Sequence, residues 1–242
     1  MPQAEDFSIG VEEEYQIIDS DSRALVSRIE SVLPKARVRG EGDAEPELYQ
    51  SQIEVGTPIC RTLADVRAEV SRLRRNVVAA AKEDECVVAA GGTHPFSHWQ
   101  EQKVTRKERY RRLRDEYQQL AREQVSFGCH IHVGFSDREA AIQTMNRART
   151  WLGPLIALGA NSPFWLGADS GFASFGRELC RRWPVAGVPP AFDSRKDHDD
   201  LVEALITMKA IGDATNVYWD IRLSARFDTL EFRGMDVCST VD

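Results

Sequence analysis

The chain has 242 residues, and its 38 acidic side chains outnumber its 31 Lys and Arg, which gives a formal net charge of −7. This balance argues against a general nucleic-acid binder, because neutralising phosphates needs an excess of basic groups. No apolar stretch is long enough to span a bilayer and the N-terminus lacks the pattern of a signal peptide, so we expect a soluble, cytoplasmic protein that does not bind membranes.

The length and the cysteines indicate an ordinary globular chain. We expect a single domain over residues 1–242, since this length can bury a substantial core. The five cysteines are scattered and form no C-x-x-C pair, which indicates neither a disulfide framework nor a zinc cluster. Free and mostly buried thiols are expected instead.

The first predicted element is a strand over residues 7–17. Apolar residues occupy its odd positions apart from Glu13, so the side chains at even positions share the opposite face. Glu12 and Glu14 lie on that face, where their like charges repel unless something positive lies between them. The rest of the sequence must supply or explain that positive charge.

The segments up to residue 92 alternate between loops and regular elements. VRGEGDAEPE (38–47) is typical of a surface loop, whereas LYQSQIEV (48–55) predicts a strand that carries Glu54. Thr62 begins a predicted helix with apolar residues at three- and four-residue spacing, and CVVAAGG (86–92) predicts a short buried strand.

A second helix is predicted after Thr105, with Glu108 completing a capping box. Its charged face, RKERYRRLRDE, is interpreted as solvated because acids are interspersed with the bases. The strand that follows, VSFGCHIHVGF (125–135), puts apolar residues on one face and His130 and His132 on the other.

The C-terminal half predicts helices and two further strands. Ser136 and Glu139 are predicted to cap a long helix towards Leu158, kinked at Pro154, and another helix is expected near residues 199–211. The two strands are VYWDIRLSARF and TLEFRGMD, in which alternation places Arg222, Glu231 and Arg233 opposite the apolar residues.

Separated strands thus carry acids, imidazoles or guanidiniums opposite their apolar residues. If the strands pair in one sheet, these polar faces line a common concavity, and a divalent cation could supply the missing positive charge, because Mg²⁺ prefers carboxylate oxygens and Mn²⁺ also tolerates imidazole. The alternative is a sheet with one face in water. The residues concerned are Glu12, Glu14, Glu54, His130, His132, Arg222, Glu231 and Arg233.

Other patterns indicate no catalytic site. His94 and His98 flank Pro95 without a third ligand nearby, and His198 is most simply an exposed residue at a helix start. No P-loop or dinucleotide fingerprint is present. Cys129 points away from the face of its neighbour His130, which weakens a Cys/His nucleophile.

Six motifs, in chain order, resemble those of the carboxylate–amine ligase family, the type 2 glutamate–cysteine ligases. They are GVEEEYQIID, ELYQSQIEVGTP, GTHPFSHW, FGCHIHVGF, ANSPFW and LEFRGMD. The resemblance implies an α+β, glutamine-synthetase-like fold, in which a curved antiparallel sheet with helices on its outer face cradles ATP, divalent metals and an amino-acid carboxylate.

The resemblance also implies roles for single residues. Arg233 matches a phosphate-contacting, catalytic position, Arg222 is a second candidate for both the catalytic role and contact with ATP, and Glu47 is a further candidate for contact with ATP. A regular strand puts Glu47 on the opposite face from Glu54 unless a bulge intervenes. Five residues match metal-ligand positions for Mg²⁺ or Mn²⁺: Glu12, Glu14, Glu54, His132 and Glu231.

The implied function is an ATP-dependent ligase that forms an amide through an acyl phosphate. Its substrates would be a small amino acid and an amine, such as glutamate and cysteine in glutathione biosynthesis. Two alternatives stay open: a two-metal hydrolase using the same acids, and a non-catalytic nucleotide-binding subunit. Because the family continues past LEFRGMD, we expect a domain that lacks a C-terminal portion, is less active and associates with itself.

Overall fold

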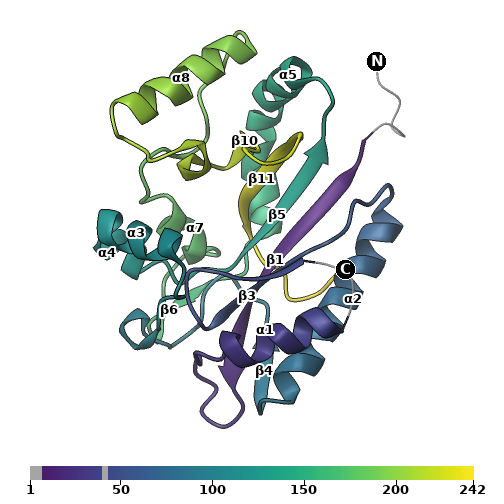
Figure 1. Ribbon diagram of the computed structural model, residues 1–242, viewed down its shortest axis with the longest axis vertical. Helices are drawn as coiled ribbons and strands as arrows, with labels where there is room; N and C mark the ends of the chain where they lie inside the picture. Colours follow the sequence, from purple (N-terminus) through teal and green to yellow (C-terminus); the bar gives the residue numbers. More distant parts are fainter. Residues whose placement is uncertain (1–6, 40–42) are drawn as a thin grey trace.

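The computed structural model describes residues 7–39 and 43–242 and centres on a seven-stranded antiparallel sheet (Figure 1). Its strands follow the order β10-β11-β5-β1-β3-β2, and β4 pairs with the second half of β1. Their bounds are β1 (Ile9–Asp19), β2 (Asp43–Pro46), β3 (Gln52–Gly56), β4 (Cys86–Ala89), β5 (Gly128–Gly134), β10 (Ile221–Leu223) and β11 (Thr229–Asp236).

Four helices cover one face of this sheet, and each half of the sheet has its own core. Under α1 (Ile29–Val38) and α2 (Leu63–Lys82) the core includes Tyr15, Ile17 and Ile53. Under α5 (Arg138–Ala148) and α6 (Leu152–Leu158) the apolar side chains of β10 and β11 pack against the helices. Because side chains alternate along a strand, burying these residues turns the charged positions to the opposite face.

The remaining elements lie outside the main sheet and the four helices that cover it. They are the helices α3 (Glu108–Tyr117), α4 (Gln119–Arg122), α7 (Phe175–Cys180) and α8 (Arg195–Thr207), the 3₁₀ turns η2 (Trp99–Glu101), η3 (Arg149–Trp151) and η4 (Ala214–Asn216), and the strands β6 (Phe164–Trp165), β7 (Ala168–Asp169), β8 (Ala186–Gly187) and β9 (Tyr218–Trp219). Strands β6 and β7 form an antiparallel pair, and β8 and β9 a parallel one.

The predicted α+β fold with a curved antiparallel sheet is confirmed, as is the helix that begins after Thr62. Thr62 accepts a hydrogen bond from the backbone of Asp65, whose side chain accepts from the backbone of Thr62, and this reciprocal cap explains where α2 starts.

The other two predicted caps are wrong. Helix α3 begins after Lys107 without a side-chain cap, and the hydroxyl of Thr105 has no hydrogen-bond partner among the described residues. Helix α5 is capped by Asp137 rather than Ser136, because the Asp137 carboxylate accepts from the backbone of Glu139 and Ala140.

Two predicted boundaries also shift. The helix expected to reach Leu158 is interrupted by η3, before Pro154, and Pro154 itself is accommodated in the first turn of α6, where a proline costs no intrahelical hydrogen bond. The helix expected near residues 199–211 is α8, which begins at Arg195 after the Ser194 cap and ends at Thr207.

The predictions for residues 38–55 need correction. Residues 40–42 of the expected loop lie outside the described residues, but Asp43–Pro46 form strand β2, paired with β3. The expected strand 48–55 is shorter, because residues 48–51 make the turn between β2 and β3. His198, expected to be exposed, is buried against Phe192 and Trp219.

Within the described residues, no helix combines the length and the apolar character that crossing a membrane requires.

Candidate active site

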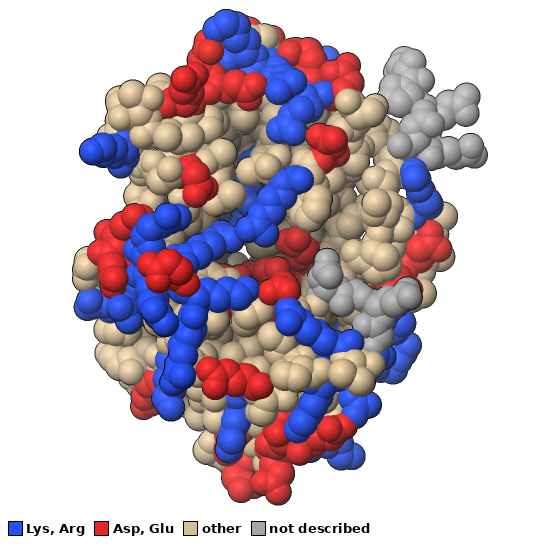
Figure 2. Space-filling model, in the orientation of Figure 1, with Lys and Arg blue, Asp and Glu red and all other residues tan. Residues whose placement is uncertain are grey.

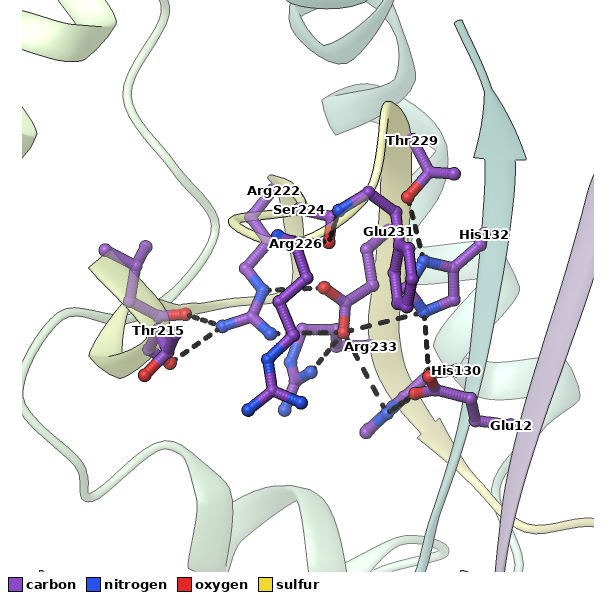
Figure 3. A network of polar contacts seen from close by, with 12 residues as sticks. Glu12, His130, His132, Thr215, Arg222, Ser224, Arg226, Thr229, Glu231 and Arg233 are labelled. Atoms are coloured by element: carbon purple, nitrogen blue, oxygen red, sulfur yellow. Dashed lines mark hydrogen bonds and ion pairs between the residues drawn. The ribbon is translucent and has the colours of Figure 1, made fainter. Parts of the chain in front are cut away.

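Charged side chains form rows across the sheet on the face away from the four covering helices. Arg222 on β10 lies opposite Glu231 on β11, and Glu231 lies opposite His132 on β5. One row further along, His130 on β5 lies opposite Glu12 on β1. Strand pairing therefore gathers side chains that are more than 200 residues apart in sequence, and Figure 3 shows them pointing toward one another.

Glu12, His132 and Glu231 form the tightest group, with one potential ligand atom of each lying within 4.8 Å of the others. Nε2 of His132 is 3.4 Å from a carboxylate oxygen of Glu12 and 4.0 Å from one of Glu231. His130 adds a second imidazole, with its Nδ1 3.3 Å from Glu12. Two carboxylates and two imidazoles thus converge on one small volume.

The orientation of His132 favours a metal ligand. Its Nδ1 lies 2.9 Å from the hydroxyl of Thr229, which can accept the ring proton. Nε2 is buried and has no hydrogen-bond partner within residues 7–39 and 43–242. A proton on Nδ1 leaves a lone pair on Nε2 facing carboxylate oxygens, an arrangement that a cation stabilises.

Glu231 stays ionised because two guanidiniums flank it. Burial alone would raise its pKa, but the charges of Arg233 and Arg222 outweigh burial and hold the pKa of Glu231 well below its usual range. The pKa of Glu12 is lowered as well, because the hydrogen bond from His130 and the charge of the two imidazoles overcome burial. Both groups are therefore carboxylates at neutral pH.

Arg222 and Arg233 differ in how many of their guanidinium nitrogens have hydrogen-bond partners. Arg222 donates to Glu231 at 2.7 and 3.2 Å and to the backbone carbonyls of Thr215 and Val217 at 3.0 and 2.7 Å, so every nitrogen of its guanidinium has a partner. The guanidinium of Arg233 donates only to Glu231 within the described part of the chain, and it lines the cleft. Arg222 holds Glu231 in place, whereas Arg233 keeps donors free.

A second group consists of the carboxyls of Glu14, Glu47 and Glu54, three residues that are half-buried. Glu14 and Glu54 lie directly opposite each other on β1 and β3. Burial, together with the charge of Glu47, raises the pKa of Glu14 to about 8, although the backbone N–H of Gly128 donates to it at 2.8 Å. Burial and the neighbouring acids likewise raise the pKa of Glu54. Among the described residues, no Lys or Arg forms an ion pair with these three carboxyls, whereas Glu231 pairs with two arginines.

Glu47 lies with Glu14 and Glu54 although the described strands have no bulge at this point, which a regular strand running from Glu47 to Glu54 would have required. It follows β2 in the turn before β3, so the alternation of a strand does not determine its direction. The hydroxyl of Tyr110 lies within hydrogen-bond distance of two acceptors, Glu47 at 3.0 Å and the carbonyl of Pro46 at 3.1 Å, which ties α3 to the turn. Burial raises the pKa of Glu47 as well.

Both groups line one cleft of about 530 Å³, a size suited to a nucleotide or a comparable small molecule. Figure 2 shows acidic side chains at the bottom of a hollow on this face and basic side chains reaching over it. Lys107, Arg109 and Arg226 are exposed residues of this rim. The charged face of α3 was predicted to be solvated only, yet its first turn contributes to the cleft.

Several functional candidates were missed or rejected from sequence. Thr229 and Tyr110, which hold His132 and Glu47, carry no motif and become visible only through their contacts. His94, rejected as a ligand, accepts from the backbone N–H of Ser97 and contacts the carbonyl of Arg23, a structural role. The thiol of Cys129 has a raised pKa, caused first by burial, which disfavours a nucleophile.

The sequence pattern that defines glutamate-cysteine ligase family 2 matches residues 8–242. A protein from Roseiflexus castenholzii, provisionally named glutamate–cysteine ligase 2, is 43% identical over 236 residues, which cover 98% of this chain and 62% of that protein. One from Rhodopirellula baltica with the same provisional name is 42% identical over 240 residues, covering 97% and 64%. The chain therefore spans less than two thirds of the length of these relatives.

Two solved structures share the fold. A bifunctional glutathione synthetase from Pasteurella multocida superimposes with a TM-score of 0.71 at 19% identity, over 96% of this chain and 36% of that one. A glutamate–cysteine ligase from Francisella tularensis, solved in complex with AMP, gives a TM-score of 0.65 at 11% identity, over 95% and 61%. At these identities the likeness concerns the fold alone.

Proposed function

The chain belongs to glutamate-cysteine ligase family 2, and from that premise we propose that it carries the nucleotide and metal site of an ATP-dependent ligase that joins a carboxylate to an amine. Glutamate and cysteine are the substrates we propose, by analogy with the names of its relatives. The reaction would pass through an acyl phosphate, formed when the carboxylate takes the γ-phosphoryl group of ATP and consumed when the amine attacks.

The observation that carries this proposal is the convergence of Glu12, His132 and Glu231 beside a second group of half-buried acids. The unpartnered Nε2 of His132 and the raised pKa values of Glu14 and Glu54 both fit bound divalent cations, which would supply the missing positive charge. Glu12, His132 and Glu231 would hold one Mg²⁺ or Mn²⁺, and Glu14, Glu54 and Glu47 another. This changes the role proposed for Glu47 from a contact with ATP to a carboxylate of the metal site.

When bound, the divalent cations would offset negative charge on the phosphates during transfer. Arg233 supports the same charge from the protein side, because its guanidinium lines the cleft and has donors to spare after binding Glu231. Arg222 has no free nitrogen for a ligand, so we propose that it positions Glu231 rather than contacts ATP. The basic rim would attract the anionic ligand into the cleft.

Two alternatives use the same site. A two-metal hydrolase would activate water between the cations, and a binding subunit would hold nucleotide without turnover.

The test is to incubate this chain with ATP, Mg²⁺ or Mn²⁺ and sets of amino acids and amines, and to measure ADP and coupled product together. A ligase releases ADP in proportion to amide product and needs both substrates. Phosphate release without the amine would favour the hydrolase, and nucleotide binding without turnover would favour the binding subunit.

A further inference from the structure

On the face of the sheet opposite the cleft, the buried Glu13 and Tyr15 of β1 form a cluster with the half-buried Arg74 of α2. Glu13 and Tyr15 are 5% and 1% exposed, and the hydroxyl of Tyr15 donates to the Glu13 carboxylate. Arg74 donates to both oxygens of Glu13, at 2.9 and 2.6 Å, and its guanidinium lies 5.6 Å from the centre of the Tyr15 ring. A buried carboxylate is thus paired at both oxygens, as its low exposure requires.

The same guanidinium also holds the chain that leaves β11. Arg74 donates to the carbonyls of Cys238 and Ser239 at 2.8 and 3.1 Å, just after β11 ends at Asp236. Figure 1 shows this last segment running beside α2. One side chain of α2 therefore connects β1 to the end of β11, although these two strands do not pair with each other because β5 lies between them.

The position of this connection matters because β11 contains an irregularity. Phe232 pairs with Ile131, but Met235 pairs with Cys129, so β11 carries one extra residue between these two pairs. A strand that slips by one residue turns every side chain to the other face. Glu231 and Arg233 point into the cleft only while the two parts of β11 keep their present registers.

We infer that Arg74 is a positioning residue for the proposed cation site. Its guanidinium is hydrogen-bonded to Glu13 on β1 and to the residues that follow β11, and these strands lie on either side of β5. These bonds fix the spacing between β1 and β11, and hence the spacing between Glu12 and Glu231. Leu73 and Val77 of α2 are buried in the core and keep the helix in place, and they thereby keep the Arg74 guanidinium within reach of its partners. The effect on cation binding rests on the proposed function, whereas the effect on the register of β11 does not, since that register can be measured without metal.

The test compares two Arg74 variants with a control on the same helix. Arg74→Lys keeps a positive charge for Glu13 but loses the planar fork that reaches four acceptors at once. The double variant Glu13→Gln/Arg74→Met removes the hydrogen bonds of Arg74 without leaving a buried unpaired charge, and glutamine still offers an acceptor to Tyr15. Val77→Ala leaves a cavity in the same core and lowers stability without touching Glu13 or the segment after β11.

Mn²⁺ affinity and backbone hydrogen exchange are measured for each variant well below its melting temperature. We expect both Arg74 variants to bind Mn²⁺ about tenfold more weakly than the unaltered chain, as is typical when a group supporting a metal ligand is lost. Exchange of the amides of residues 232–235 should accelerate in the same variants, whereas Val77→Ala should lower the melting temperature and change neither quantity.

Unchanged affinity and exchange in the Arg74 variants would overturn the inference, and so would their failure to fold, which would make Arg74 a general stabiliser of the core. If the unaltered chain binds no Mn²⁺, the proposed cation site falls, and faster exchange at residues 232–235 in the Arg74 variants alone would still support the register role.

Discussion

Arg222 and Glu231 lie opposite each other on β10 and β11, and the guanidinium donates to both carboxylate oxygens, at 2.7 and 3.2 Å. The backbone carbonyls of Thr215 and Val217 hold the same guanidinium from behind. Glu231 is therefore oriented by a group that is itself immobilised, which is how proteins fix a side chain that must bind with one geometry.

Removing the Glu231 carboxylate should damage the cation site. We expect Glu231→Ala to lower Mn²⁺ affinity by at least the ~10–100-fold that is typical of losing even a supporting group. Titration calorimetry with Mn²⁺ measures this, and Glu83→Ala is the control, because Glu83 is an exposed carboxylate at the end of α2 that pairs with Arg39 and does not line the cleft. Unaltered Mn²⁺ binding by Glu231→Ala would remove Glu231 from the site.

Lysine in place of each arginine should separate their roles. Arg233→Lys should mainly weaken ATP turnover, because lysine keeps the charge but cannot grip two oxygens at once. Arg222→Lys should mainly weaken Mn²⁺ binding, by about tenfold, because Glu231 loses its orientation. Parallel measurements of kcat, KM for ATP and Mn²⁺ affinity check both, and the same change of all three quantities in both variants would contradict this division.

The raised pKa of Glu14 predicts how stability depends on pH without metal. The folded chain binds the Glu14 proton up to about pH 8, whereas the ordinary value in an unfolded chain is 4.5. Between these values Glu14 holds more protons in the folded than in the unfolded state, so its contribution to the free energy of unfolding falls as pH rises from about 4.5 to about 8. Glu54, whose pKa is also raised, should contribute in the same direction.

Divalent cations should flatten this dependence, because they take the place of the protons on the ionised carboxyls. Urea unfolding at several pH values, with Mg²⁺ and with a chelator, measures both curves. Glu14→Gln should flatten the metal-free curve as well. A metal-free stability that rises steadily over the same interval would contradict the raised pKa values.

Gly92 tests the packing around the end of β11. A Cβ built at Gly92 would lie 2.1 Å from the side chain of Asp236, which is buried and bound to the hydroxyl of Ser162 and the backbone of Asn161. Gly92→Ala should therefore reduce the free energy of unfolding by about 1–3 kcal/mol, the usual cost of overpacking.

Gly153→Ala in α6 is the matched control, because a Cβ there meets nothing within 4 Å. Alanine in that helix should be neutral or stabilise by about 0.4–1 kcal/mol. Thermal and urea unfolding compare the two variants, and equal stabilities would show that the space around Asp236 adjusts freely.

The sequence by itself determined the faces of the strands. The alternation in residues 7–17, 125–135 and 229–236 predicted that Glu12, His132 and Glu231 oppose the apolar side chains, and the structure places them so, because burying one face of a strand leaves its neighbours no other direction. The start of α2 was equally predictable, since the reciprocal cap of Thr62 and Asp65 involves only neighbouring residues.

Only the tertiary structure decided which faces meet and which residues support them. The strand order that puts β5 between β1 and β11 depends on contacts between distant segments, and so does the difference between Arg222 and Arg233, which look alike in sequence. Glu47 joins the acids through a turn rather than a strand, and Arg74 reaches β11 from a helix more than 160 positions earlier in the chain. Such placements depend on the packing of whole elements, and local patterns contain no information about that packing.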